Sequence, residues 1–285
     1  MDIKNVGVVG AGAMGSGIAQ VCAQAGYSVT LSEINDELLK KGTENINRFL
    51  STSVEKGKIS QQDKDNTLKH LKGTTNIKDF TDCDLIIEAV PEEVDLKQKV
   101  FAELDEVCPK HAILASNSSG LSIIEIARVT KRLDKVLGLH FFNPVPIMKL
   151  IEVVRTIATS DDTVETCKTF GKSLGKTAVV TKDAPGFIIN RLSIPYTLNA
   201  IRILEAGLAS REDIDTAVTT GLNYPMGPLA LADFLGIDVL YNAACDMYEK
   251  TKDSQYAPPV LLQQMIAAGW YGRKAGRGFY IYNKE

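Results

Sequence analysis

The chain has 285 residues, of which 45% are hydrophobic and 24% charged, and its formal net charge is −3. This length suffices for one large or two medium domains, and the composition is typical of a soluble globular protein. The small negative charge argues against nucleic acid as a partner. No apolar run approaches the roughly 20 residues that span a bilayer, so we expect no membrane association. The N-terminus opens directly on Asp2 and a strand, so we expect neither a signal nor a transit peptide.

The cysteines bear on the cellular compartment. There are five of them, scattered along the chain and without C-x-x-C spacing. This odd number argues against a disulfide framework or a zinc site and favours a reducing, cytoplasmic location. The three histidines are far apart in the sequence, so we expect no bound metal. The cysteines are Cys22, Cys83, Cys108, Cys167 and Cys245.

The first 33 residues have the pattern of a nucleotide-binding unit. An apolar run over residues 4–9 leads into Gly10-Ala11-Gly12-Ala13-Met14-Gly15, then a helical stretch to Gly26 and a second strand over 27–32. A strand, a G-x-G-x-x-G turn, a helix and a strand together predict a dinucleotide-binding βαβ unit. The helix N-terminus would attract the phosphates. The alternative is a glycine turn that closes a strand–helix junction and binds nothing. The expected cofactor contacts in the turn are Gly10, Gly12, Ala13, Met14 and Gly15.

Glu33 ends the second strand of this unit, eighteen residues after Gly15. A carboxylate at this place can accept hydrogen bonds from the adenosine ribose hydroxyls. It would repel a 2′-phosphate, and no arginine immediately follows it. The sequence therefore favours NAD(H) over NADP(H) as the cofactor.

Residues 35–72 are polar, lysine-rich and nearly free of proline. They predict two helices broken near Gly57-Lys58-Ile59-Ser60, with Ser60 as the N-cap of the second. The segment is long for a simple crossover between strands. We therefore expect a helical arm that projects from the nucleotide-binding domain.

Alternating strands and helices continue to about residue 181, which predicts an α/β fold of the Rossmann type with a mostly parallel sheet. The apolar run over 84–90, ended by Pro91, is typical of a strand buried on both faces. The further elements that we expect are a helix over 92–108, a strand over 112–116, a helix over 122–130, strands over 136–142 and 150–154, a helix over 163–174 and a strand over 178–181.

The alternation stops at the breaker cluster Asp183-Ala184-Pro185-Gly186. We place the domain boundary there, with a Rossmann domain over 1–184 and an all-helical domain over 185–285. The second domain is rich in small and aliphatic residues, more than its own core would need. We expect part of this surface to pack against a second copy in a two-fold dimer. Its expected elements are helices over 185–206, 211–221, 228–250 and 258–269 and a strand over 278–282.

His140 is the candidate catalytic base. A nicotinamide-dependent enzyme that oxidises an alcohol needs a group to accept the hydroxyl proton as hydride leaves carbon. Histidine suits this role because its unperturbed pKa of about 6.5 lies near neutral pH. His140 lies late in the predicted strand 136–142, and ligands bind at the carboxyl ends of strands in open α/β sheets. The alternative is a core histidine whose hydrogen bonds are satisfied by packing.

Glu152 is the candidate partner of His140. It lies in the apolar strand Leu150–Val154, where a carboxylate is costly unless it is paired. If the two strands are neighbours, Glu152 can accept a hydrogen bond from one imidazole nitrogen and direct the other toward the substrate. This is the logic of the orienting carboxylate in the serine-protease triad, without a nucleophile. The alternative is a carboxylate that points outward from an edge strand.

Two further polar groups can contact a substrate. Ser116-Asn117-Ser118-Ser119-Gly120 follows a predicted strand, where its hydroxyls and amides can bind a substrate oxygen or cap the next helix. Ser122 is the candidate for that cap, and the residues alone do not choose among the three serines of the run. Asn190 lies on an apolar helix just after the domain boundary. It can project into a cleft between the domains, or it can be an ordinary buried amide.

The stretch from His140 to Val153 reads H-F-F-N-P-x-x-x-M-K-L-x-E-V, which is highly specific. With the other stretches it resembles the L-3-hydroxyacyl-CoA dehydrogenase family, most closely its short bacterial 3-hydroxybutyryl-CoA dehydrogenases. The resemblance covers essentially the whole chain. The other matching stretches are Gly10–Gln20, Ala115–Ser119, Lys182–Arg191, Pro225–Pro228 and Gly272–Tyr280.

The resemblance implies reversible, NAD-dependent oxidation of (S)-3-hydroxybutyryl-CoA to acetoacetyl-CoA. It implies His140 as the general base, Glu152 as its partner, and Ser119 and Asn190 as the groups that hold the substrate oxygens. For the cofactor it implies contacts from Glu33, where many family members have aspartate. The remaining implied contacts are those of Glu92, Lys97 and Ser119 with NAD, of Asn143 with nicotinamide and substrate, and of Lys56 with the coenzyme A phosphates.

Two other functions stay open at this point. One is a related β-hydroxyacid dehydrogenase that uses a lysine base on free 3-hydroxy acids. The other is a protein that binds NADH as a structural group or redox sensor. Loss of the histidine or the glutamate would be the mark of that second class, and this chain retains both His140 and Glu152.

Overall fold

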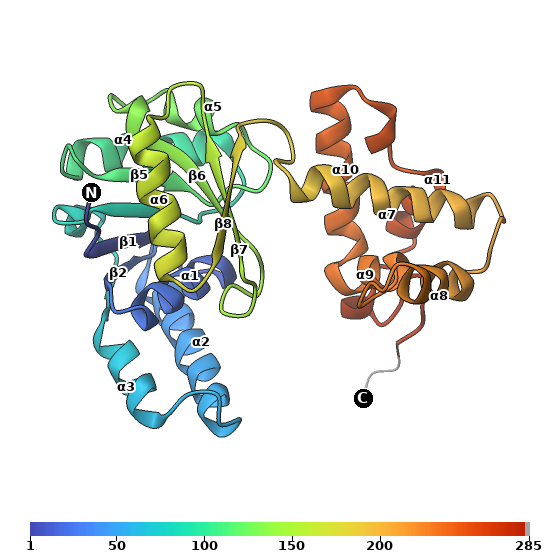
Figure 1. Cartoon of the computed structure of the whole chain (residues 1–285), viewed down its shortest axis with the longest axis horizontal. Coiled ribbons are helices and arrows are strands. Elements are labelled where there is room, and N and C mark those ends of the chain that lie inside the picture. Colours follow the sequence, from blue (N-terminus) through green and yellow to red (C-terminus); the bar gives the residue numbers. More distant parts are fainter. Residues whose placement is uncertain (283–285) are drawn as a thin grey trace. The chain divides into compact units, whose positions relative to one another are not determined.

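The computed structural model describes residues 1–282, and the chain divides into two units, Met1–Ala184 and a second that begins at Pro185 (Figure 1). Within the described residues, no single helix has the length and apolar character needed to cross a membrane. One bent pair of helices, Pro228–Leu235 and Ile237–Thr251, meets these two criteria together, with a bend of 98°.

The first unit is built on an eight-stranded sheet with the strand order β3-β2-β1-β4-β5-β6-β7-β8. β6 and β7 run antiparallel, and all other neighbours are parallel. This order confirms the predicted Rossmann-type, mostly parallel sheet. β2 and β3 are added on one side of β1, and β4 and the later strands are added on its other side. The strands are β1 (Asn5–Val9), β2 (Ser28–Ser32), β3 (Leu71–Thr74), β4 (Leu85–Glu88), β5 (Ile113–Ser116), β6 (Val136–Phe141), β7 (Leu150–Arg155) and β8 (Thr177–Lys182).

Helices cover the sheet and bury its apolar side chains. α1 (Ala13–Gln24) and α6 (Asp161–Ser173) share one hydrophobic cluster with the strands, which includes Ile18 and Phe170. α6 lies across the front of the sheet in Figure 1. α4 (Val94–Val107) and α5 (Ile123–Ala127) pack against each other, and α5 also packs on β6. The strands read as continuous apolar runs because they are covered in this way.

The charged segment after β2 folds as the predicted pair of helices, α2 (Asp36–Glu55) and α3 (Gln61–Lys69). Ser60 caps α3 in a capping box with Asp63, as its side chain and position predict. The pair extends below the sheet in Figure 1. Leu71 and Lys72, which we assigned to the helical region, begin β3 instead. β3 is a short, largely exposed edge strand, and it lacks the apolar alternation that identifies a strand from sequence.

The second unit is helical, which confirms the expected class. Its helices enclose a separate cluster that includes Leu198, Leu229 and Tyr256. The helix expected over 228–250 is broken at Gly236, whose φ of 105° is incompatible with a continuous helix. The helices are α7 (Ile189–Glu205), α8 (Arg211–Gly221), α9 (Pro228–Leu235), α10 (Ile237–Thr251) and α11 (Val260–Ala267).

The strand predicted over residues 278–282 is wrong. The region forms isolated bridges, such as Arg277 with Ile281. The backbone N–H groups of Phe279 and Tyr280 donate to the carboxylate of Asp233 at 2.9 Å each. An acidic side chain from α9 thus takes the place of a partner strand.

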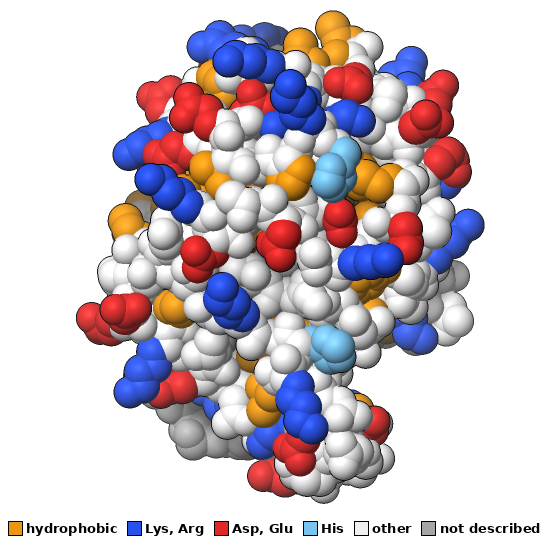
Figure 2. All heavy atoms as spheres, turned by 90° about the vertical axis from the view of Figure 1, so that its left-hand side faces the viewer, with side chains coloured by type: hydrophobic (Ala, Val, Ile, Leu, Met, Phe, Trp, Pro, Cys, Tyr) orange, Lys and Arg blue, Asp and Glu red, His pale blue; other side chains and the backbone are white. Residues whose placement is uncertain are grey.

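One face of the first unit is electrostatically mixed (Figure 2). On the face in Figure 2, lysine and arginine side chains alternate with aspartate and glutamate, and the hydrophobic side chains form small separate patches. This face shows no extended region of one sign, in keeping with the small net charge of −3.

Candidate active site

The glycine turn after β1 has the geometry that a bound dinucleotide requires. Gly10 has a φ of 96°, and a Cβ on Gly15 would lie 1.8 Å from the Gly10 carbonyl oxygen. A Cβ on Gly12, in contrast, would meet no atom within 4 Å. Gly12 is also the N-cap of α1 and offers the helix no side-chain cap. The turn is therefore open on its outer side, with the helix N-terminus available for phosphates.

Glu33 closes the back of this turn. Its Oε2 accepts a hydrogen bond from the Ala11 backbone N–H at 2.8 Å, and its Oε1 accepts one from Ile34 at 2.8 Å. A carboxylate oxygen has a second lone pair, so Glu33 can still accept a ribose hydroxyl. Its side chain is thus held next to the glycine turn.

His140 and Glu152 lie directly opposite each other in the antiparallel pair β6–β7. Nδ1 of His140 is 2.6 Å from Oε2 of Glu152, and the side chains are 8% and 0% exposed. The His140 ring also packs on Phe142, with 4.5 Å between the ring centroids. With a proton on Nδ1, His140 donates to the carboxylate, and Nε2 is the nitrogen that can accept a proton. The structure thus brings together the two residues of the predicted pair.

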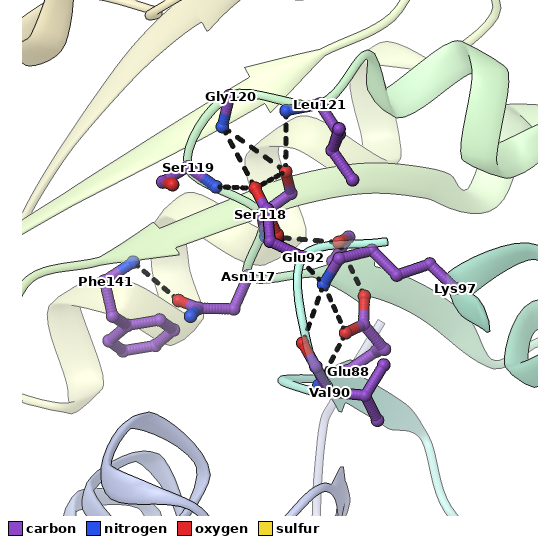
Figure 3. A network of polar contacts seen from close by, with 11 residues as sticks. Glu88, Val90, Glu92, Lys97, Asn117, Ser118, Ser119, Gly120, Leu121 and Phe141 are labelled. Atoms are coloured by element: carbon purple, nitrogen blue, oxygen red, sulfur yellow. Dashed lines mark hydrogen bonds and ion pairs between the residues drawn. The ribbon is translucent and has the colours of Figure 1, made fainter. Parts of the chain in front are cut away.

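The loop after β5, residues 117–120, is held by Glu92; we call it the serine loop. Oε1 of Glu92 accepts hydrogen bonds from Ser118 Oγ at 2.6 Å, from Ser119 N at 2.9 Å and from Gly120 N at 3.2 Å (Figure 3). Burial raises the pKa of Glu92, but the charge of Lys97 and these hydrogen bonds outweigh burial and hold the pKa below its ordinary value. Glu92 therefore stabilises the loop that presents Ser119.

A buried ion pair lies beneath the serine loop. Lys97 Nζ is 2.6 Å from Glu88 Oε1 and 3.3 Å from Glu92 Oε2, and the Lys97 and Glu88 side chains are 1% and 0% exposed. Ser116 Oγ donates to the other oxygen of Glu88 at 2.7 Å, and Val90 N donates to Oε1 at 2.7 Å. Burial raises the pKa of Glu88, and Lys97 opposes that shift. Glu88 was not among the site residues expected from the sequence, although it is a carboxylate within an apolar run, the same signal that identified Glu152.

A groove of about 460 Å³ links the expected cofactor and coenzyme A contacts. It is lined by α1, α2 and the β6–β7 loop (residues 142–149), and its lining includes Ala13, Lys56 and Asn143. Lys176 holds this loop in place, because its Nζ donates to the Val145 and Met148 carbonyls at 2.7 and 2.6 Å. Burial lowers the pKa of Lys176. The groove therefore borders both the start of α1, at Ala13, and Lys56, the C-cap residue of α2.

The proposed cap at Ser122 is wrong in its detail. Ser122 is the N-cap residue of α5, but its side chain makes no cap hydrogen bond. The carboxylate of Asp183 accepts hydrogen bonds from Ile123 N at 3.0 Å and Ile124 N at 2.8 Å instead. A carboxylate is the stronger acceptor at a helix N-terminus. Local sequence could not reveal a cap supplied by a residue sixty positions away.

The remaining candidates differ in their setting. Ser119 is exposed, and its backbone is fixed by Glu92. Asn190 lies in the first turn of α7, in the second unit. The first unit alone therefore assembles the glycine turn, Glu33, the His140–Glu152 pair and the serine loop.

An open glycine turn, an acidic residue after β2 and a buried histidine–carboxylate pair on a Rossmann sheet are typical of an NAD-dependent dehydrogenase. Residues 5–184 match the family described as "3-hydroxyacyl-CoA dehydrogenase, NAD binding domain". Residues 186–282 match "3-hydroxyacyl-CoA dehydrogenase, C-terminal domain". The chain belongs to the 3-hydroxyacyl-CoA dehydrogenase family, and it is an NAD-dependent oxidoreductase.

Similar proteins span the whole chain. The 3-hydroxybutyryl-CoA dehydrogenase of Mycobacterium tuberculosis is 47% identical over 98% of this chain and 99% of its own length. The probable 3-hydroxybutyryl-CoA dehydrogenase of Bacillus subtilis is 42% identical over 100% of this chain and 99% of its own. The crystal structure of (S)-3-hydroxybutyryl-CoA dehydrogenase from Ralstonia eutropha superposes with a TM-score of 0.96, at 42% identity, over 99% of this chain and 100% of that one. These matches confirm the family resemblance inferred from sequence.

Proposed function

We propose that this protein catalyses the reversible, NAD-dependent oxidation of (S)-3-hydroxybutyryl-CoA to acetoacetyl-CoA. The observation that carries the proposal is the buried pair of His140 and Glu152, with 2.6 Å between Nδ1 and Oε2. The pair lies toward the carboxyl end of β6, on the edge of the sheet that also carries the glycine turn. The proposed substrate, 3-hydroxybutyryl-CoA, is taken from the names of relatives that match over the full length.

In the oxidative direction, His140 accepts the proton of the C3 hydroxyl on Nε2. Bound NAD supplies the acceptor for the hydride that leaves C3 as the carbonyl forms. The imidazolium that results is stabilised by the Glu152 carboxylate, which also holds Nδ1 in its protonated form. In the reductive direction, protonated His140 polarises the C3 ketone and returns the proton to its oxygen.

The substrate is held by residues whose roles the family resemblance suggests. Ser119 and Asn190 bind the C3 and thioester oxygens, and Asn143 contacts both nicotinamide and substrate. Lys56 binds the phosphates of coenzyme A. The groove of about 460 Å³ supports this assignment, since Lys56 and Asn143 both line it.

The cofactor contacts follow the same logic. Glu33 accepts hydrogen bonds from the adenosine ribose, and its charge disfavours a 2′-phosphate. Gly10, Gly12, Ala13, Met14 and Gly15 bind the pyrophosphate. Glu92 and Lys97, which follow β4, and Ser119, which follows β5, complete the proposed contacts with NAD.

We also propose a homodimer in the cytoplasm, with the helical unit as the dimerisation surface. The support is a set of exposed large apolar side chains on that unit, among them Leu208 at 77%, Leu192 at 66% and Leu222 at 60%. Light scattering coupled to size-exclusion chromatography would test the oligomeric state, and a monomer at working concentration would contradict it.

The central experiment follows NADH oxidation with acetoacetyl-CoA, with longer 3-ketoacyl-CoAs and with free acetoacetate. We expect turnover with acetoacetyl-CoA and little with free acetoacetate. Turnover of free acid but not thioester would indicate the related β-hydroxyacid dehydrogenase class instead. Tight NADH binding without turnover of any acyl-CoA would indicate a structural or sensory NADH-binding protein.

The variant His140→Ala tests the assignment of the base. We expect its kcat to fall by about 10² to 10⁴ while its affinity for NADH stays nearly unchanged. A variant that keeps most of its turnover would remove His140 from the mechanism. The exposed His70 provides the control, since His70→Ala should retain wild-type turnover.

A further inference from the structure

We propose that Asn117 is a positioning residue for His140. Its side-chain oxygen supplies the hydrogen-bond acceptor that strand β6 requires where strand β5 ends. This inference rests on the proposed function, because it assumes that His140 performs the proton transfer.

The need for an acceptor arises from the unequal ends of the two strands. The parallel register of β5 and β6 ends at the pair Ser116–Gly138, whereas β6 continues to Phe141. Phe141 is 1% exposed, so its backbone N–H requires a partner within the protein. Asn117 Oδ1 accepts the hydrogen bond from Phe141 N at 3.0 Å (Figure 3). A side chain thus continues the ladder after the backbone of β5 has turned away.

This contact acts directly on His140. The N–H of Phe141 belongs to the planar peptide group that also contains the His140 carbonyl. The direction of that N–H therefore sets the backbone angle ψ of His140. This angle in turn affects the direction in which the imidazole projects from the strand. The ring must point so that Nδ1 stays 2.6 Å from Glu152 Oε2. Asn117 is therefore linked through one peptide group to the geometry of the catalytic pair.

Asn117 is itself held from both sides. Its backbone N–H donates to the Glu88 carbonyl at 2.8 Å. The residue before it, Ser116, donates its hydroxyl to the Glu88 carboxylate, and the residue after it, Ser118, donates to Glu92. Figure 3 shows the Asn117 side chain directed away from these two acids, toward Phe141. The Glu88–Lys97 ion pair thus helps to hold the Asn117 side chain in place. That side chain in turn holds the end of β6.

The test compares Asn117→Ala with Asn117→Asp. Alanine removes the acceptor, whereas aspartate keeps an oxygen in the same place. We expect Asn117→Ala to lower kcat with acetoacetyl-CoA by about tenfold to a hundredfold, the cost of misplacing a catalytic group, with the KM for NADH nearly unchanged. Asn117→Asp should recover most of the lost kcat. Its added negative charge near His140 should move the pH profile of kcat to higher pH.

Two measurements do not depend on turnover. Hydrogen exchange of the peptide that contains Phe141 should become faster in Asn117→Ala and stay slow in Asn117→Asp. The NMR signals of the His140 ring, one of three histidines in the chain, should shift in the alanine variant but not in Asn76→Ala. Asn76 is the matched control, since its exposed side chain accepts a hydrogen bond from Lys78 N at the start of a 3-10 helix.

The outcomes separate the alternatives. Wild-type turnover in Asn117→Ala, or unchanged exchange at Phe141, would overturn the inference. Equal loss of kcat in both variants with a raised KM for NADH would also overturn it, because Asn117 would then be a cofactor ligand. If the wild-type protein turns over no 3-ketoacyl-CoA, the proposed function fails. The exchange and NMR measurements still decide whether Asn117 positions His140.

Discussion

The ammonium group of Lys97 is the buried counter-charge of Glu88, with 2.6 Å between Nζ and Oε1 and side-chain exposures of 1% and 0%. Lys97 also contacts the carbonyl oxygen of Val90 at 3.1 Å and the carboxylate of Glu92. One cation therefore serves two acids, one inside the sheet and one that holds the serine loop. Loss of the Lys97 charge should therefore lower the stability of the fold more than it lowers the catalytic rate.

The variant Lys97→Met should lose about 3–5 kcal/mol of stability, because it leaves Glu88 buried without its counter-charge. The double variant Glu88→Gln with Lys97→Met should recover much of this loss, since no charge then remains at the buried position. Urea unfolding of the two single variants, the double variant and the wild type measures both effects in one cycle. Lys99→Met, at an exposed position two residues along α4, is the control. A double variant no more stable than Lys97→Met alone would contradict the counter-charge role.

Glu92 should make the stability of the protein sensitive to acid. Its pKa is held below the ordinary value of 4.5, so it contributes stability above that value and loses it as the pH falls through the folded-state pKa. In Glu92→Gln this part of the acid sensitivity should disappear. Urea midpoints measured at about pH 7 and about pH 4 compare the variant with wild type and with Glu93→Gln, its exposed neighbour. An equal loss of midpoint in all three proteins would exclude Glu92 as the source.

Glu152→Gln should lower kcat by about tenfold or more, but by less than His140→Ala, since the base itself is retained. The glutamine cannot stabilise the imidazolium by charge. The pH profile of the oxidative reaction should therefore move to lower pH. Steady-state rates measured across the pH range give both quantities. Glu165→Gln, which alters a surface pair with Lys168, should match the wild type. A Glu152→Gln variant with a normal pH profile would refute the orienting role.

Glu33→Gln should reduce the preference for NADH over NADPH. The amide keeps an oxygen that can accept from Ala11 N, but it no longer repels a 2′-phosphate. We expect NADH affinity to fall modestly and NADPH affinity to rise, and fluorescence titration of both cofactors measures the ratio. Glu37→Gln, in the exposed first turn of α2, controls for general loss of negative charge. An unchanged ratio would mean that another group selects the cofactor.

Sequence sufficed for the features that depend on local pattern. Apart from the edge strand β3, the order of strands and helices in the first unit, the glycine turn and the N-cap at Ser60 all follow from turn chemistry and apolar periodicity. The sequence predicted that Glu152 would pair with His140 if their two strands were neighbours, since a carboxylate within apolar strand residues needs a partner. That condition is met because β6 and β7 are antiparallel neighbours in the sheet.

Other features depend on contacts that local pattern does not encode. Asp183 caps α5 across sixty residues, and Asn117 reaches Phe141 across twenty-four. The break at Gly236 depends on one positive φ angle, in a segment whose sequence otherwise favours a continuous helix. Polar side chains that satisfy distant backbone groups carry no periodic signal, so three-dimensional proximity is required to find them.

The antiparallel register of β6 and β7 has a consequence for how this family of sequences can vary. Side chains alternate faces along a strand, so deleting or inserting a single residue between Leu150 and Glu152 would turn the carboxylate to the opposite face and set an aliphatic side chain against the imidazole. The connecting segment before Leu150 can change in length without that penalty. Single-residue insertions or deletions within β7, in natural or engineered variants, should therefore abolish catalysis.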